Sequence, residues 1–438
     1  MKLAFIDTDG CLVSVATRVQ QEGHRVLYWA KADEEATAGE GIVPKATTLK
    51  QILAFTPDAV VCYQCPEIAT TLRGLRVPSW GSSPMAASLE EDRMAAARLA
   101  EGVGIAVPET QAFTSMDAAL RFLAQTDQDA WVFKASGGPE VECSQTHVTK
   151  TKDELRSVID FEGRVHGATD FILQEVVEGV EISTEGWYDY RVGWLRPFNA
   201  TLERKALMAG DTGPMAGAMG SIVWAWPDDR LADLTVKRMT RWLEKARYVG
   251  PLDINTILDH ETQTPWFLEF TPRLGWDAFE ALMAGIDEGA LGPFCVALAR
   301  GEADTVPVDP DVYMAAIRYY MPAVPDAPIL APWRANRHLV PKNVWFDGQT
   351  LRSTGAMTDN GFSMLFEAIG TGRTIHEAVR PLYDRVILKI AAPGGFARPD
   401  IGEQAQRDVD TLMVWGYHVP GVHGVNIPSL LPVDLAMR

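Results

Sequence analysis

The chain has 438 residues, of which 47% are hydrophobic and 22% are charged, and its formal net charge is −18 at pH 7. This composition is that of a globular protein, and the length suffices for roughly two to four domains. The charge excludes a basic surface that tracks a nucleic-acid backbone, and no apolar run is long enough to span a bilayer, so neither a nucleic-acid polymer nor a membrane is expected as a partner.

Strands and helices alternate over the first eighty residues. Strands are expected at 3–7, 25–30, 58–63 and 77–81, and helices at 11–22 and 49–55. This alternation predicts a parallel, Rossmann-like sheet with right-handed crossovers, whose ligands lie in the loops at the carboxyl ends of the strands. The loops 8–10 and 64–67 are therefore candidate ligand loops.

The five cysteines indicate a reducing compartment, because their number is odd and their spacing is not that of a disulfide framework. Acidic residues interrupt the N-terminal strand before the apolar stretch of a signal peptide can form, so a cytoplasmic protein is expected. Cys62 and Cys65 form a C-x-x-C pair, which suits a redox pair or half a zinc site. No second such pair exists and Cys62 lies in an apolar strand, which favours ordinary reduced thiols.

A smaller and a larger mixed segment follow. A helix with acidic residues in its first turn is expected at 89–102. The smaller segment has strands at 107–113, 131–136 and 171–177 and helices that begin near 115 and 152. The larger one has strands at 182–188, 221–226, 252–258 and 266–271 and a helix at 239–248. Beyond residue 303, the runs 312–320, 343–348 and 384–390 predict a β-rich terminal region.

The strand 266–271 ends in a group of polar residues, Glu269, Thr271 and Arg273. Because successive side chains of a strand alternate between its faces, these three point to the same side. A carboxylate beside an arginine suits a magnesium–phosphate centre, in which the carboxylate binds the metal and the arginine binds phosphate oxygens. The alternative is a buried strand that ends in a surface ion pair.

Asp253 and Lys134 add to this candidate centre. Asp253 lies in an apolar strand, where a carboxylate needs a partner. If its strand pairs with that of Glu269, the two carboxylates converge in a way that suits magnesium bridged to a triphosphate, whereas an aspartate that caps the turn is the alternative. Lys134 ends a strand just before two glycines, which suits a phosphate ligand, and a solvated lysine is the alternative.

Two further segments have the composition of ligand-binding loops. In 171–183, the hinge at Glu175 offers backbone groups to a flat heterocycle and Glu181 suits two ribose hydroxyls, unless the segment is only an acidic loop between strands. Segment 210–221 has four glycines in twelve residues and follows the basic pair Arg204-Lys205. This suits a backbone that approaches an anionic ligand or closes over it, and a flexible hairpin is the alternative.

Taken in order, these motifs resemble those of ATP-grasp ligases, and more closely the phosphoribosylamine–glycine ligase family, over most of the chain. The segments that carry the resemblance are VVCYQCPE (60–67), SLEEDR (88–93), WVFKAS (131–136), LQEVVEGVEIS (173–183), GDTGPMAGAMGS (210–221), FLEFTPRLG (267–275), GRTIHEAVRPLY (372–383) and FARPDIG (396–402).

The resemblance implies a set of residue roles. The residues matched to ATP binding are Arg93, Lys134, Glu175, Val177 and Glu181. Those matched to the metal are Glu269 and Thr271, with Asp253 at the aspartate ligand of the D-alanine–D-alanine ligase branch. Those matched to catalysis are Lys134 and Arg273. Those matched to substrate binding are Glu67, Asp211, Gly213, Gly217, Gly220 and Arg273.

The chain departs from the family around the amine acceptor. TDGCLVS (8–14) stands in place of the family's Gly-Gly-Arg-Glu-His-Ala loop, and Met215-Ala216 in place of Asn-Thr. Thr271 replaces a metal-binding asparagine, a change for which Asp253 would compensate. The segment 275–278 is Gly-Trp-Asp-Ala where the family has Gly-Asp-Pro-Glu, and the loop after Lys134 is shortened. The ATP chemistry is therefore expected to be kept and the amine site to be rebuilt.

These observations predict a mixed α/β and α+β chain with an ATP-grasp fold. The expected domains are a Rossmann-like domain at 1–82, an ATP-grasp domain at 83–310 with a nucleotide-clamping subdomain at about 107–178, and a β-rich domain at 311–438. The expected activity is that of an ADP-forming carboxylate–amine ligase of purine biosynthesis with ATP and Mg²⁺, glycine as carboxylate, and a monomeric or homodimeric state. The alternatives are a ligase with another amine, such as a modified nucleotide, and a nucleotide-binding homologue that has lost turnover.

Overall fold

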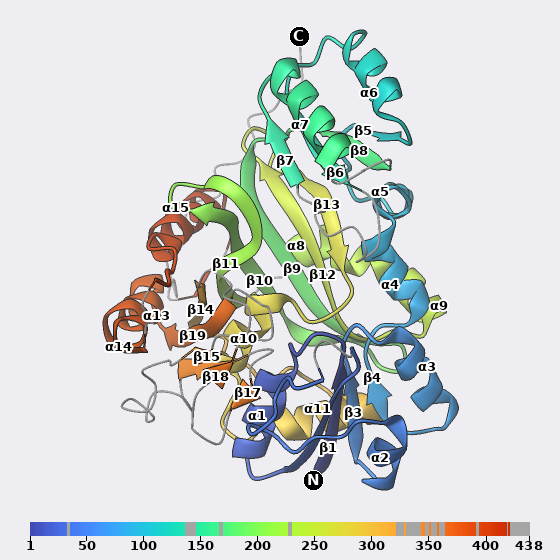
Figure 1. Cartoon of the computed structure of the whole chain (residues 1–438), viewed down its shortest axis with the longest axis vertical. Helices are drawn as coiled ribbons and strands as arrows, with labels where there is room; N and C mark the ends of the chain where they lie inside the picture. The colour runs from blue at the N-terminus through green and yellow to red at the C-terminus, as the bar shows by residue number, and fades with distance from the viewer. Residues whose placement is uncertain are drawn as a thin grey trace.

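The fold is that of a computed structural model (Figure 1). The structure describes residues 1–32, 36–135, 146–165, 170–226, 230–320, 328–329, 343–346, 350–351, 357–358, 364–390, 394–417 and 419–420. The predicted glycine turn after Lys134, in the segment 136–145, lies outside these residues. No helix within the described ranges is long and apolar enough to cross a membrane.

The N-terminal region forms the predicted parallel sheet. Its strands are β1 (Lys2–Asp7), β2 (Arg25–Ala30), β3 (Ala59–Cys62) and β4 (Ser79–Trp80), in the order β2-β1-β3-β4. The helices between them are α1 (Val13–Gln21), α2 (Leu49–Ala54) and α3 (Pro66–Gly74). The sheet lies at the lower end of the molecule in Figure 1. Alternation of apolar runs with turn residues thus predicted both the elements and their parallel pairing.

The expected single helix at 89–102 is wrong, because the structure has two helices there. α4 (Pro84–Glu91) ends at Asp92, and α5 (Arg93–Gly102) begins just after it. Asp92 has a non-helical backbone, with a ψ of 89°, and its carboxylate accepts a 2.9 Å hydrogen bond from the Ala95 N–H. An aspartate that caps a new helix in this way ends the preceding one.

A small four-stranded sheet forms the upper end of the molecule (Figure 1). Its strands, in the order β5-β8-β6-β7, are β5 (Thr110–Phe113), β8 (Phe171–Glu175), β6 (Trp131–Ala135) and β7 (Thr146–Thr149). Helices α6 (Met116–Leu123) and α7 (Lys152–Val165) pack on it. Phe133, Leu173 and Leu155 belong to its separate apolar core, which makes this sheet a structural unit of its own.

The centre of the molecule is an eight-stranded sheet with the order β13-β12-β9-β10-β11-β14-β19-β16. The first five strands in this order come from residues 179–271 and are β9 (Gly179–Asp189), β10 (Gly193–Met208), β11 (Thr212–Trp226), β12 (Val249–Asp259) and β13 (Pro265–Thr271). β10 was not predicted from the sequence. The interpretation of 210–221 as a loop is also wrong for its greater part, because residues from 212 onward belong to β11, which pairs with β10 in a long hairpin.

The two faces of this sheet enter different apolar cores. On β11, Ile222 and Trp224 belong to one core, whereas Val223 and Ala225 belong to the other, as alternation along a strand requires. The second core also contains apolar residues of the N-terminal sheet and of helices α10 (Trp276–Gly285) and α11 (Leu291–Arg300). The first core lies among helices α8 (Arg230–Leu234), η1 (Val236–Met239), α9 (Thr240–Ala246), α13 (Ile375–Pro381) and α15 (Ile401–Val414).

The central sheet continues into the region after residue 311. β14 (Tyr313–Tyr320) pairs with β11, β19 (Met364–Gly372) pairs with β14, and β16 (Val344–Trp345) adds an edge. Three short strands, β15 (Pro328–Ile329), β18 (Met357–Thr358) and β17 (Thr350–Leu351), form a separate sheet. The hydrogen-bonded network therefore crosses residue 310, and the domain boundaries themselves stay a prediction.

The expected strand at 384–390 is wrong, because this run is helical. A π-helix, η3 (Leu382–Ile387), leads into α14 (Leu388–Ile390). Leu382, Val386 and Ile390 recur every four residues and are buried in the core, which is the spacing of a helix face. A short apolar run does not distinguish a strand from a buried helix, and here the four-residue period decides.

Candidate active site

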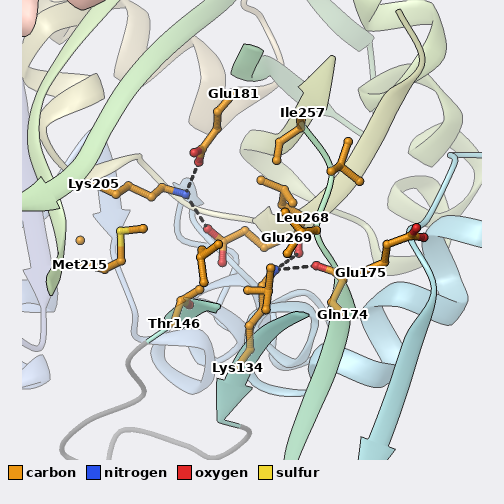
Figure 2. A pocket seen from close by; sticks show the side chains of 15 residues that line it. Lys134, Thr146, Gln174, Glu175, Glu181, Lys205, Met215, Ile257, Leu268 and Glu269 are labelled. Carbon is orange, nitrogen blue, oxygen red and sulfur yellow. Dashed lines mark hydrogen bonds and ion pairs between the residues drawn. The ribbon is translucent and has the colours of Figure 1, made fainter. Parts of the chain in front are cut away.

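Two adjoining pockets lie on the central sheet, and the larger one is also lined by the small sheet. One has a volume of about 440 Å³ (Figure 2), and the other has a volume of about 290 Å³. Lys205, Gly217 and Glu269 line both of them. A ligand that is apolar at one end and charged at the other can therefore extend from one pocket into the other.

The larger pocket is mainly apolar. Its apolar lining residues come from both sheets and are Val132, Val148, Val176, Val177, Met215, Ile257 and Leu268. Glu175 also lines it, but its N–H donates to the Glu109 carbonyl over 2.8 Å, and its carboxylate points away from Lys134 in Figure 2. Of the predicted hinge, Val176 and Val177 add apolar side chains to the lining of this pocket.

Lys134 lies in β6 at the floor of this pocket. Its ammonium donates to Gln174 Oε1 over 2.9 Å and to the Leu268 carbonyl over 3.4 Å. Burial lowers the pKa of Lys134 to about 8, because desolvation disfavours the charged form. Its two partners are neutral, so the charge of Lys134 is available to an anionic ligand.

Lys205 lies at the centre of the site, although the sequence did not single it out. Its ammonium is 3.0 Å from Glu181 and 3.2 Å from Glu269 (Figure 2). It is also 3.6 Å from Glu203. It belongs to β10, where it shares a face with Glu203. The sequence signal was the basic pair at 204–205, which acquires its meaning only once β10 is known to be a strand that points Lys205 into the pocket.

The carboxylates around Lys205 differ in their protonation. The positive charge of Lys205 holds the pKa of Glu269 well below its usual range, and Arg93, 3.5 Å away, acts in the same direction. Burial raises the pKa of Glu203 to about 7 despite the same lysine. Glu269 is therefore fully ionised at neutral pH. Arg93 also donates to the Ala135 carbonyl over 3.1 Å, which ties α5 to the small sheet.

The predicted metal ligands meet on the paired strands β12 and β13. Asp253 lies directly opposite Thr271, and Glu269 lies opposite Asn255, so all four side chains share one face and line the smaller pocket. Asp253 Oδ1 is buried and has no hydrogen-bond partner, and burial raises the pKa of this carboxyl group to about 7. An unpartnered carboxylate oxygen in a pocket is a group that a cation would satisfy.

These ligands do not form a complete cage. Among the described residues, no group of three or more His, Cys, Asp and Glu side chains is arranged to hold a metal ion. Two carboxylates and a threonine hydroxyl nevertheless fit Mg²⁺, which is bound in nucleotide sites through one or two carboxylates together with phosphate oxygens and water.

Arg273 also lines the smaller pocket, but it is already engaged. Its Nε is 3.0 Å from both carboxylate oxygens of Glu90, and its Nη1 donates to Tyr63 Oη over 3.1 Å. The guanidinium groups of Arg273 and Arg318 both lie over the Trp276 ring, at 5.9 and 5.2 Å from its centre. The arginine is therefore positioned at the site with its charge largely balanced by Glu90.

The five other predicted substrate residues are not brought together. Gly217 lines both pockets, whereas Gly213 and Glu67 are exposed and line neither. Asp211 lies at the tip of the β10–β11 hairpin, 2.7 Å from Arg398. A Cβ on Gly220 would come within 2.8 Å of the Ala316 carbonyl, so this glycine serves the close packing of β11 on β14.

The two predicted ligand loops of the N-terminal sheet meet. Thr8 donates to Gln64 over 3.3 Å. The buried Asp7 carboxylate accepts hydrogen bonds from the Leu12 N–H at 2.7 Å and the Tyr28 hydroxyl at 2.6 Å, which fixes the first loop. Nearby, Cys62 is buried and unoxidised, and burial raises the pKa of its thiol to about 12, as expected for an inert cysteine.

Residues 92–276 match the family model of the phosphoribosylglycinamide synthetase ATP-grasp (A) domain. A phosphoribosylamine–glycine ligase of Rhizobium meliloti is 24% identical over 432 residues, which cover 92% of this chain and 99% of the relative. The chain is an ATP-grasp protein that is similar to phosphoribosylamine–glycine ligases. The matched segment begins at the capping Asp92 and ends at Trp276, so it contains most of both pockets.

Other relatives match in part. A chloroplastic phosphoribosylamine–glycine ligase of Arabidopsis thaliana is 25% identical over 362 residues, and the match spans 78% of this chain and 66% of the relative. The chain matches only 15% of the human trifunctional purine biosynthetic protein adenosine-3, at 29% identity. The crystal structure of phosphoribosylamine–glycine ligase from Thermotoga maritima superimposes with a TM-score of 0.68 at 19% identity, over 91% of this chain and 100% of that one. This last likeness concerns the fold.

Proposed function

We propose that this ATP-grasp protein is an ADP-forming ligase that joins a carboxylate to an amine. The observation that carries the proposal is the continuity of an apolar pocket with a polar one through Lys205, Gly217 and Glu269. An adenine base suits the first pocket, and a triphosphate and a carboxylate substrate suit the second. The names of the relatives support the same activity.

In this proposal, different residues of the two pockets bind the base, the ribose and the phosphates of ATP. The backbone near Val177 binds the base, and the Glu181 carboxylate accepts hydrogen bonds from the ribose. Lys134, Arg93 and Lys205 stabilise the phosphates and the negative charge that develops during phosphoryl transfer, which is chiefly a matter of positioning and electrostatics.

Asp253 and Glu269 would hold Mg²⁺, with Thr271 beside them. The ion, when bound, would neutralise phosphate charge. Lys205 and Arg93 pair with Glu269 in the structure, and phosphate oxygens would replace this carboxylate as their partner once ATP is present. The unpartnered oxygen of Asp253 is the second support for this assignment.

The proposed reaction has two steps. A carboxylate oxygen attacks the γ-phosphorus of ATP and forms an acyl phosphate, with ADP as the leaving group. The amine then attacks the acyl carbon, phosphate leaves, and an amide forms. Glycine and phosphoribosylamine are the proposed substrates, which would place the chain in purine biosynthesis. Cytoplasmic location and a monomeric or homodimeric state stay predictions.

A second candidate is the same chemistry with a different amine. It is favoured by the acceptor side of the pocket, where Glu90 neutralises Arg273 and the Trp276 ring contacts the guanidinium groups of two arginines. Such a surface offers a flat aromatic face and little net positive charge. It suits an amine with a planar group better than one that carries a lone phosphate.

Release of ADP by the purified protein tests both candidates. We expect Mg²⁺-dependent release with glycine and phosphoribosylamine, or with another member of a panel of amino acids and amines. Glu269→Ala should abolish turnover, whereas Glu288→Gln, at an exposed position outside the pockets, should not change it. Magnesium-dependent ATP binding without ADP formation for any pair would instead indicate a homologue that has lost turnover. Near-normal activity of Glu269→Ala would refute the metal assignment.

A further inference from the structure

A third cavity of about 1010 Å³ lies outside the site described above. It opens to solvent and is bordered by the end of α3, by β4 and the start of α4, by the turn between α9 and β12, and by the end of α11. Figure 1 shows α3, α4 and α9 on one side of the central sheet. Its lining shares no residue with the two pockets of the proposed ligase site.

This cavity is strongly cationic in a chain of net charge −18. Six cationic side chains line it, Arg73, Arg76, Arg191, Lys245, Arg247 and Arg300, against one carboxylate, Glu302. Asp189 and Asp58, which lie outside the lining, pair with Arg191 at 2.6 Å and with Arg300 at 3.3 Å. Three of the six positive charges are thus balanced, and an excess of three remains.

The remaining cations are held in place without losing their charge. Arg73 donates to the Gly81 carbonyl over 2.9 Å and to the Arg247 carbonyl over 3.4 Å, and these neutral partners fix its guanidinium at the cavity wall. Arg247 donates to Tyr190 Oη over 3.0 Å and lies over that ring. Arg76 and Lys245 make no ion pair with any residue in the described part of the chain.

Neutral donors complete the lining. Ser79 lines the cavity and is only 3% exposed, and its hydroxyl has no hydrogen-bond partner in the described structure. Ser83 and Pro84 place the N-terminus of the eight-residue helix α4 in the same wall, where the helix dipole favours an anion. A buried hydroxyl without a partner is costly, and an acceptor oxygen of a ligand would satisfy it.

We propose that this cavity binds a small anion with two or more phosphate-type charges, such as a pyrophosphate group. The excess of three cations matches the charge of such a ligand, and the volume limits it to a small molecule. The acidic remainder of the chain repels a long polyanion, which excludes a nucleic-acid strand as the favoured occupant. The Ser79 hydroxyl and the start of α4 bind one end of the anion, and Lys245 and Arg247 bind the other.

Titration calorimetry with inorganic pyrophosphate tests this inference in the full chain. The ligase pockets are first filled with a non-hydrolysable ATP analogue and Mg²⁺. We expect saturable binding, and Lys245→Gln and Arg247→Asn should each weaken it about tenfold, the effect of one charge-assisted hydrogen bond. Asparagine is chosen because Arg247 has a φ of +49°, which asparagine tolerates.

Two further variants separate direct contact from general effects. Ser79→Ala should weaken binding and leave the melting temperature of the ligand-free protein unchanged, because its hydroxyl has no partner to lose. Lys50→Gln, at an exposed lysine of α2, should bind pyrophosphate as the wild type does. Absence of saturable heat at millimolar pyrophosphate would overturn the inference. An equal loss of pyrophosphate affinity in Lys50→Gln would also overturn it, and so would tighter binding of a DNA duplex than of pyrophosphate.

Discussion

Replacement of Lys205 by methionine should show how strongly the stability and the activity of the candidate site depend on one cation. The side chain keeps its length but loses a charge that lies 3.0 to 3.6 Å from three carboxylates. Two unit charges 4 Å apart attract by about 4 kcal/mol at an effective dielectric constant of about 20. Much of this attraction offsets the desolvation of the lysine. Because Lys205 is 21% exposed and the three carboxylates are 22% to 38% exposed, solvent screening places the cost of losing the lysine between about 1 kcal/mol for an exposed pair and about 3–5 kcal/mol for a buried one.

The pH dependence of the stability lost in Lys205→Met distinguishes an electrostatic effect from a packing effect. In the wild type, Glu269 has a depressed pKa, so it stabilises the fold above the unfolded pKa of about 4.3 and less as the pH falls through the folded value. Without Lys205, the pKa of Glu203, which burial already raises to about 7, rises further, and the pKa of Glu269 rises from its depressed value. The ionised form of Glu203 then destabilises the protein more strongly at high pH, and protonation relieves this penalty as the pH falls.

Differential scanning calorimetry between pH 5.5 and 8.5 measures this effect. We expect the melting temperature of Lys205→Met to lie furthest below that of the wild type at pH 8.5, and the difference to narrow toward pH 5.5. ADP formation should fall about 10²–10³-fold, as for the loss of one group that stabilises the transition state. Lys205→Arg is the charge-preserving control. A pH-independent difference, or ADP formation within threefold of the wild type, would refute the reasoning.

Three further predictions concern other parts of the chain. Because burial lowers the pKa of Lys134 to about 8, affinity for an ATP analogue should fall between pH 7 and 9 as this lysine loses its proton, and titration of a Lys134→Gln variant should lack this step. Arg318→Met breaks a buried 2.8 Å ion pair with Glu367 and should cost about 3–5 kcal/mol of unfolding free energy in urea, whereas Arg380→Met at an exposed pair should cost less than about 1 kcal/mol. Asp92→Ala removes the cap between α4 and α5 and should lower stability by about 1 kcal/mol in the same assay, and an unchanged midpoint would contradict the capping role.

The sequence predicted those helices and strands that a short run of apolar residues marks on its own. The strand that carries Glu269 and the parallel N-terminal sheet were expected from short apolar runs, and both are present. β10 was missed because polar residues such as Glu203 and Lys205 alternate along it, facing a pocket rather than solvent. The run 384–390 was misassigned because its apolar residues suit a strand as well as a helix. Only the packing against the core shows that residues four positions apart are buried on one helix face.

The candidate site was predictable to the extent that its residues lie in motifs. Asp253 and Glu269 were expected to converge, and the antiparallel register brings them to one face. Lys205 was not assigned, because its role depends on three carboxylates that come from different strands. The engagement of Arg273 by Glu90 was also unforeseen, since the two residues are 183 positions apart in the chain.

The contacts at the tip of the β10–β11 hairpin affect how the protein folds during translation. The Gly210 N–H donates to Asp400 over 2.8 Å, and the fully buried Arg398 donates to the Ala206 carbonyl over 3.0 Å and pairs with Asp211. The strands that carry Lys205 and Gly217 are therefore anchored by residues translated almost 200 positions later. Because nascent chains fold from the N-terminus onward, the hairpin leaves the ribosome long before its anchor exists. Nucleotide affinity should thus appear only after residues 398–400 have been translated and have left the ribosome, and a chain truncated before residue 396 should fold its N-terminal sheet yet bind ATP poorly.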